Sequence, residues 1–119
     1  MNYDQRHLKI AVDFDGTIVT NEFPDIGTEL PDAIRTLKDL QKAGHKIIIW
    51  TCRCEPWLGP VTNYLADRGF TPDAINSNVG KVDAFGVPKI VADIYMDDRS
   101  FPPFTDWQDV RRKILNEWE

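Results

Sequence analysis

The sequence alternates short aliphatic runs with amphipathic segments of helix length, and no other feature restricts the fold as much. The longest run, KIIIW at residues 46–50, is almost continuously apolar, as strands of a parallel sheet are when both of their faces are covered. Parallel strands need long crossovers between them, and helices usually provide these. The alternation therefore predicts an α/β fold: a Rossmann-like parallel sheet in three layers, with helices on both faces.

Apolar spacing, proline and glycine set the limits of the expected elements. Strands are expected at residues 8–14, 46–51, 73–76 and 90–96, and helices at 31–43, 55–68 and from about 105. The helix at 55–68 has Trp57 on its apolar side. The last helix has Trp107 and Trp118 on its apolar face, and we expect these two tryptophans to be packing residues. Since no linker or repeat interrupts the pattern, we expect a single domain over residues 1–119.

Composition and charge exclude several classes of partner. A net charge of -5 and a pI near 4.9 argue against nucleic acid or an anionic membrane surface, because both attract basic proteins. The first ten residues contain no apolar signal segment, so we expect a cytoplasmic protein without a membrane partner. The two cysteines, Cys52 and Cys54, stand too close together to form an easy disulfide, and we expect reduced thiols.

The stretch VDFDGTIV at residues 12–19 brings two carboxylates together at the end of an apolar strand. In extended backbone the side chains of Asp13 and Asp15 point the same way. Two anions about 5 Å apart repel each other by about 3 kcal/mol at an effective dielectric constant near 20. Gly16 allows the turn that must follow. The pair therefore calls for a ligand that compensates its charge.

Other polar residues are expected at the same edge of the sheet, because the carboxyl ends of parallel strands lie together. Thr51 ends the second strand, and Asp97 and Asp98 end the last one. A hard divalent cation such as Mg²⁺ would compensate such a cluster of carboxylates. The structural alternative is turn chemistry at each pair, with Arg99 forming a surface ion pair. The presence of two acidic pairs, each at the end of a strand, favours the functional interpretation over the structural one.

The order of these motifs resembles that of the haloacid dehalogenase (HAD) superfamily of phosphohydrolases. The resemblance covers residues 8 to about 99 and consists of D-x-D-G-T at 13–17, the strand ending in Thr51 and the strand ending in Asp97–Asp98. It implies a HAD-like fold and a Mg²⁺-dependent phosphatase that hydrolyses a small phosphomonoester. The windows at 18–30 and 77–91 are too short for the cap domain that many members carry, so an uncapped member is expected.

The resemblance also assigns roles to residues. Asp13 would be the nucleophile that forms an aspartyl-phosphate, and Asp15 the general acid and base. Thr51 would hold a phosphoryl oxygen with its hydroxyl and its backbone N–H. Lys89 would offset the phosphate charge, with Lys81 as the alternative. The remaining expected substrate contacts are Gly16, Thr17, Cys52 and Arg53, and the expected metal ligands are Asp13, Asp15 through its main-chain carbonyl, Asp97 and Asp98.

Several alternatives stay open at this point. Arg53 either binds a substrate anion or pairs with Glu55, and Asp93 is expected to be structural. Without a cap, water must be excluded by a homo-oligomeric neighbour, by a large substrate, or by a local flap at residues 21–27, NEFPDIG. The competing function is a catalytically weak phosphate-sensing or protein-interaction domain on the same scaffold. A receiver-like domain fits less well, because it does not call for D-x-D followed by Gly-Thr.

Overall fold

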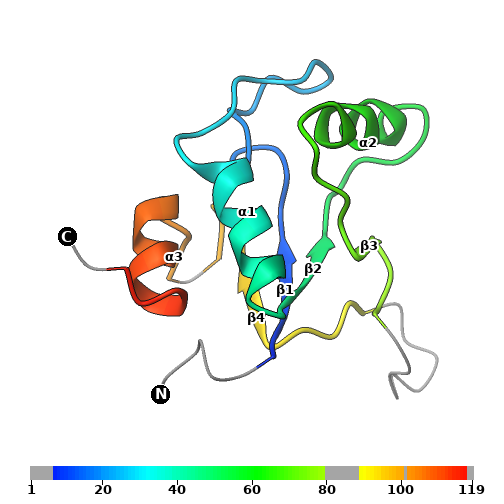
Figure 1. Ribbon diagram of the computed structural model, residues 1–119. Coiled ribbons are helices and arrows are strands. Elements are labelled where there is room, and N and C mark those ends of the chain that lie inside the picture. The colour runs from blue at the N-terminus through cyan, green and yellow to red at the C-terminus, as the bar shows by residue number, and fades with distance from the viewer. Residues whose placement is uncertain (1–6, 80–88, 101, 118–119) are drawn as a thin grey trace.

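The computed structural model describes residues 7–79, 89–100 and 102–117. Within them, four parallel strands form one sheet in the order β3-β2-β1-β4, and three helices accompany it (Figure 1). The strands are β1 (Lys9–Val12), β2 (Lys46–Ile49), β3 (Ala74–Ile75) and β4 (Ile94–Met96). The helices are α1 (Ala33–Lys42), α2 (Leu58–Asp67) and α3 (Trp107–Ile114). The predicted α/β class and all-parallel sheet are confirmed.

The sheet register brings three strand ends level with one another. Val12 at the end of β1 is paired with Ile49 of β2 on one side and with Met96 of β4 on the other. From β1 the chain steps to β2 and then to β3, and it returns past β1 to reach β4. The chain thus places successive strands on one side of β1 and then β4 on its other side, so the direction of strand addition changes between β1 and β4. In open α/β sheets, ligands bind beyond the carboxyl ends of the strands at such a point.

The core lies on one face of the sheet. Every second residue of the strands belongs to this core, together with the apolar faces of all three helices. Its largest buried members include Trp107, Phe14, Phe70, Leu37 and Leu65. Right-handed crossovers that step in one direction place their helices on the same side, which accounts for α1 and α2. The three described helices all pack against this core, and the prediction of helices on both faces stays a prediction. The connection from β3 to β4, which reverses direction, includes residues 80–88, outside the described ranges.

The second helix differs most from its prediction. α2 begins at Leu58 and not at residue 55, because proline disfavours helical backbone in the residue before it and Pro56 follows Glu55. Trp57 therefore precedes the helix and is 42% exposed, whereas the apolar spacing had placed it inside the helix. Its ring packs edge-on against Phe23 with 6.0 Å between ring centroids. Trp118, predicted to pack beside α3, lies outside the described residues.

The fourth strand is also shorter than expected, beginning at Ile94 rather than at residue 90. Asp93 precedes it, and its backbone N–H donates to the Lys9 carbonyl at 2.7 Å. Its carboxylate accepts a hydrogen bond of 2.8 Å from the Lys9 backbone N–H. Asp93 therefore has the predicted structural position, at the amino edge of the sheet.

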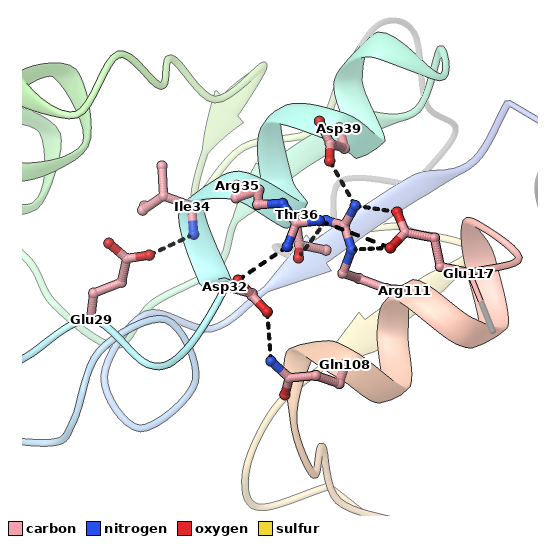
Figure 2. Close-up of polar contacts among 9 residues, drawn as sticks. All are labelled: Glu29, Asp32, Ile34, Arg35, Thr36, Asp39, Gln108, Arg111 and Glu117. Atoms are coloured by element: carbon pink, nitrogen blue, oxygen red, sulfur yellow. Dashed lines mark hydrogen bonds and ion pairs between the residues drawn. The ribbon is translucent and has the colours of Figure 1, made fainter. Parts of the chain in front are cut away.

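A buried arginine joins α3 to α1 (Figure 2). Arg111 on α3 donates to Thr36 Oγ1 at 3.1 Å and to Asp39 Oδ2 at 2.8 Å on α1, and it also binds both carboxylate oxygens of Glu117. Gln108 donates to Asp32 before α1 at 2.7 Å. These contacts fix the last helix against the core. None of the described helices is long and apolar enough to cross a lipid bilayer.

Candidate active site

Three carboxylates converge at the carboxyl edge of β1 and β4. Asp13 directly follows β1, and its backbone N–H extends the ladder to the Met96 carbonyl at 2.9 Å. Asp97 and Asp98 directly follow β4. Carboxylate oxygens of the three residues lie within 4.8 Å of one another. The neighbouring strands thus bring together residues more than eighty positions apart in the sequence.

Gly16 allows this cluster to form. Its φ of +87° is disfavoured for other residues, and a Cβ built on it would stand 2.5 Å from Asp98 Oδ2. The missing side chain of Gly16 thus leaves the space that the Asp98 carboxylate occupies. The expected turn at Asp97 is also present, because Asp97 Oδ1 accepts a hydrogen bond of 2.9 Å from the Arg99 backbone N–H. The turn engages one oxygen of Asp97, so the structural and functional interpretations of this carboxylate are compatible.

The cluster carries negative charge that nearby cations do not balance. Burial raises the pKa of Asp13 to about 7, and the charges of Asp97 and Asp98 add to the rise while the Phe14 backbone N–H opposes it. Burial also raises the pKa of Asp98, followed by a hydrogen bond and charge repulsion from Asp97. No lysine or arginine forms an ion pair with these three carboxylates in the described part of the chain. Their chemistry therefore favours a bound cation.

Asp15 faces away from this cluster, toward Arg53. The guanidinium group donates to both carboxylate oxygens of Asp15, each at 2.7 Å, and only 1% of the Arg53 side chain is exposed. Asp15 is therefore not a side-chain member of the carboxylate cluster. The ion pair of Arg53 is with Asp15 and not with Glu55, so the structural alternative considered for it is wrong, whereas binding of a substrate anion stays a prediction.

The other N–H groups of Arg53 donate to backbone carbonyls. They donate to Pro24 at 3.1 Å, Asp25 at 2.8 Å and Trp57 at 3.3 Å. The guanidinium carbon also lies 5.0 Å from the centroid of the Phe23 ring. A guanidinium group has five N–H bonds, and all five are thus used within the protein. Substrate binding by Arg53 would therefore require one of these hydrogen bonds to be exchanged for one to the substrate.

Thr51 lies at the edge as predicted, but one of its two expected donors is occupied. Its backbone N–H donates to Asn76 Oδ1 at 2.8 Å, and its Oγ1 accepts a hydrogen bond of 3.1 Å from the Arg53 backbone N–H. The N–H is therefore not free to hold a phosphoryl oxygen, whereas the hydroxyl hydrogen is. Asn76, which follows β3 with φ of 51°, is a residue that sequence reasoning missed. Its only sequence signal was its position at a strand end.

A cavity of about 540 Å³ opens above these residues. Its lining joins the predicted acids, Thr51, Cys52 and Arg53 to four residues that the sequence had not assigned to the site: Asn21, Phe23, Trp50 and Arg99. Asn21 and Phe23 come from residues 21–27, the segment predicted as a flap, which we call the flap below. Phe23 is 53% exposed and Trp50 37%, so aromatic surface faces solvent on this wall.

Three predicted substrate contacts, Gly16, Thr17 and Lys89, do not line the cavity. Thr17 is fully buried, and its carbonyl accepts a 2.9 Å hydrogen bond from Trp107 Nε1, which makes it a core residue. Lys89 is exposed, and its carbonyl accepts from Asn78 Nδ2 at 3.1 Å. The strand ending at Asp97 begins only at Ile94, so Lys89 belongs to the loop before it. Lys81, the alternative lysine, lies outside the described residues.

Comparison with known proteins identifies one relative. No family model and no curated protein matches the chain. A solved structure of a conserved protein from Bacteroides thetaiotaomicron superposes with a TM-score of 0.85 and 34% sequence identity, covering 96% of this chain and 94% of that one. The two chains belong to one family. Since the description of the Bacteroides relative names no activity, the function of the family must be argued from the site.

Proposed function

We propose that this protein is a Mg²⁺-dependent phosphatase of the HAD superfamily that hydrolyses a small phosphomonoester through an aspartyl-phosphate. The observation that supports it most is the convergence of Asp13, Asp97 and Asp98 beside Thr51 at the carboxyl edge of a parallel sheet. These residues belong to the D-x-D-G-T, Thr and Asp-Asp motifs of the resemblance, and their convergence supports the proposal. A HAD-like fold without a cap is part of the proposal.

The carboxylate cluster fits Mg²⁺. Octahedral Mg²⁺ with bonds of about 2.1 Å has ligand oxygens roughly 3 to 4 Å apart, close to the 4.8 Å limit that contains the three carboxylates. Asp13 and Asp97 would hold the ion, with Asp98 and the main-chain carbonyl of Asp15 completing the protein ligands. When bound, Mg²⁺ neutralises the carboxylates and offsets the charge of the transferring phosphoryl group.

The residues divide the reaction into two displacements at phosphorus. A carboxylate oxygen of Asp13 bonds to phosphorus while the bond from phosphorus to the leaving oxygen breaks, and Asp15 gives that oxygen a proton. Asp15 then takes a proton from water as the water oxygen bonds to phosphorus. The bond between Asp13 and phosphorus breaks, which releases inorganic phosphate and restores the Asp13 carboxylate and the protonated Asp15. The Thr51 hydroxyl orients a phosphoryl oxygen throughout.

The cavity supports a substrate of modest size. Its volume of about 540 Å³ lies within the range of small-molecule sites and accommodates a phosphate with a leaving group about as large as a sugar or a nucleoside. Phe23 and Trp50 offer it aromatic surface, and Arg99 is the cation on the wall beside them. We keep Lys89 as the proposed phosphate-charge residue, with Lys81 as its alternative. A homo-oligomeric neighbour remains a proposed way of covering the opening.

The test is the release of inorganic phosphate from a panel of sugar, nucleotide and aryl phosphates, with Mg²⁺ or with a chelator. Wild type is compared with Asp13→Asn and with Asp67→Asn, an exposed aspartate on α2 that serves as the matched control. We expect release that needs Mg²⁺, is lost in Asp13→Asn and is unchanged in Asp67→Asn. Phosphate release that survives in Asp13→Asn would refute the nucleophile.

The competing function, a phosphate-sensing or interaction domain, is favoured by one observation: Lys89 does not line the cavity. A binding domain would retain orthovanadate or phosphate in the presence of Mg²⁺ without turning over any ester. Calorimetric titration with orthovanadate, run beside the phosphate assay, separates the two functions.

A further inference from the structure

Arg53 joins the acid of the site to the flap. Toward the sheet it holds both oxygens of Asp15, and toward the flap it holds the carbonyls of Pro24 and Asp25. The base of the flap is closed separately, by a hydrogen bond of 2.8 Å from the Thr20 N–H to the Thr28 carbonyl. Arg53 thus supplies hydrogen bonds to the inner part of the flap, in addition to the packing of Ile26 against the core and of Phe23 against Trp57.

We propose that Arg53 is a positioning residue that makes docking of the flap and orientation of Asp15 a single event. The proposal rests on the proposed function, which gives Asp15 its role as general acid and base. It assigns Arg53 no direct contact with substrate, because all five of its N–H groups donate to this chain. The leaving group would sense the arrangement through Phe23, which lines the cavity and stacks on Arg53.

The geometry leaves Asp15 able to exchange a proton. An ionised carboxylate offers about four acceptor positions, and the two hydrogen bonds from Arg53 occupy one on each oxygen. Two parallel hydrogen bonds fix the plane of the carboxylate, so the directions of the remaining acceptor positions are fixed as well. Lysine, a point charge on a flexible chain, cannot reproduce this fork or reach both Asp15 and the flap carbonyls.

Arg53→Lys tests this inference through the choice of leaving group. Glycerol phosphate has an alkoxide leaving group that needs a proton, whereas 4-nitrophenyl phosphate has one that departs without it. The leaving group departs when the phosphoryl group is transferred to Asp13, and kcat/KM reports this step without the later attack of water. We expect kcat/KM on glycerol phosphate to fall about 100-fold or more in Arg53→Lys, as loss of general acid catalysis does, and kcat/KM on the nitrophenyl ester to fall less than about tenfold. Arg68→Lys, an exposed arginine that also stacks on an aromatic ring, is the matched control and should change neither value.

Hydrogen exchange tests the flap directly and needs no substrate. We expect the Asp25 backbone amide, which donates to the Glu22 carbonyl at 2.9 Å within the flap, to exchange faster in Arg53→Lys than in wild type and to be unchanged in Arg68→Lys. Phe23→Ala supplies a second variant should Arg53→Lys not fold, because Phe23 is largely exposed. In Phe23→Ala, exchange of the Asp25 amide and of Arg53 Nε–H should rise together.

The outcomes distinguish this inference from the proposed function. Equal losses on the two esters, or a flap amide that exchanges at its wild-type rate in Arg53→Lys and Phe23→Ala, would overturn the positioning role. If wild type releases phosphate from neither ester, the phosphatase proposal fails, and flap exchange alone then supports or refutes the coupling of Arg53 to the flap.

Discussion

Acidic side chains gather in two regions of this molecule, and the two are built in opposite ways. At the junction of α1 and α3, Asp39 and Glu117 surround the guanidinium group of Arg111 (Figure 2). At the carboxyl edge of the sheet, Asp13, Asp97 and Asp98 lie together, and no lysine or arginine of the described residues forms an ion pair with them. The first region lowers the pKa of Glu117 through the hydrogen bonds from Arg111, whereas the second raises the pKa of Asp13.

The contrast separates structural from functional acids by their partners rather than by residue type. Where acids and a cation are paired, as around Arg111, the loss of one partner lowers stability because the other charge is left unpaired. A cluster of like charges costs stability and persists where function needs it. The same argument distinguishes the two buried arginines. Arg111 joins two helices, whereas Arg53 joins a site residue to the flap beside it.

The largest expected effect comes from exchanging an acid in each region for its amide. Asp13→Asn should lower phosphate release on the order of 10⁴-fold or more, as loss of a nucleophile does, while stability in chelator rises because repulsion is relieved. Asp39→Asn should leave turnover unchanged and lower stability, because Arg111 loses a charged partner. Urea unfolding and phosphate assays on both variants measure this. A stability loss in Asp13→Asn would mean that the two regions are not opposites.

Arg111→Met examines the balanced region alone. We expect the free energy of unfolding to fall by about 2 kcal/mol, less than for breaking a fully buried ion pair, because Asp39 and Glu117 are partly exposed and regain water. Turnover below the unfolding transition should match wild type. The urea midpoint provides the measurement. An unchanged midpoint would show that the contacts of Arg111 do not stabilise the junction of α1 and α3.

The amino-acid sequence was sufficient to predict the acids of the site because strand ends are local features. An apolar run followed by aspartate places Asp13 and Asp97 at one edge whatever else the chain does. It was not sufficient for Arg53, whose partners come from Asp15, the flap and the turn before α2. The occupied N–H of Thr51 was equally hidden, because it depends on the left-handed backbone of Asn76. The apolar spacing placed Trp57 inside the helix, but Pro56 delays the start of α2 until Leu58.

The pH dependence of stability should differ in sign between the regions. The folded pKa of Asp13, about 7, lies above its usual value of 3.8, so its contribution favours the folded state at low pH and is lost as pH rises from about 4 to 7. The pKa of Glu117 is lowered, so its contribution is present above its unfolded pKa and is lost as pH falls.

In chelator, we therefore expect wild type to lose on the order of 2 kcal/mol of stability between about pH 4 and 7 relative to Asp13→Asn. Urea unfolding across this range tests the difference between the two proteins. Parallel pH profiles would show that the carboxylate cluster is not under repulsion. Adding Mg²⁺ should remove the difference if the cluster binds the ion.

The smallest expected effect concerns the lysine that would offset the charge of the phosphate. Lys89→Met should lower kcat/KM about tenfold, a loss of roughly 1.4 kcal/mol of transition-state stabilisation, if Lys89 approaches the phosphoryl group when substrate binds. Lys81→Met should have less effect, and Lys46→Met, an exposed lysine at the start of β2, should have none. Steady-state kinetics on a single phosphomonoester rank the three. The reverse order for Lys89 and Lys81 would assign the phosphate charge to Lys81, and no effect of either would leave Arg99 as the cation of the cavity wall.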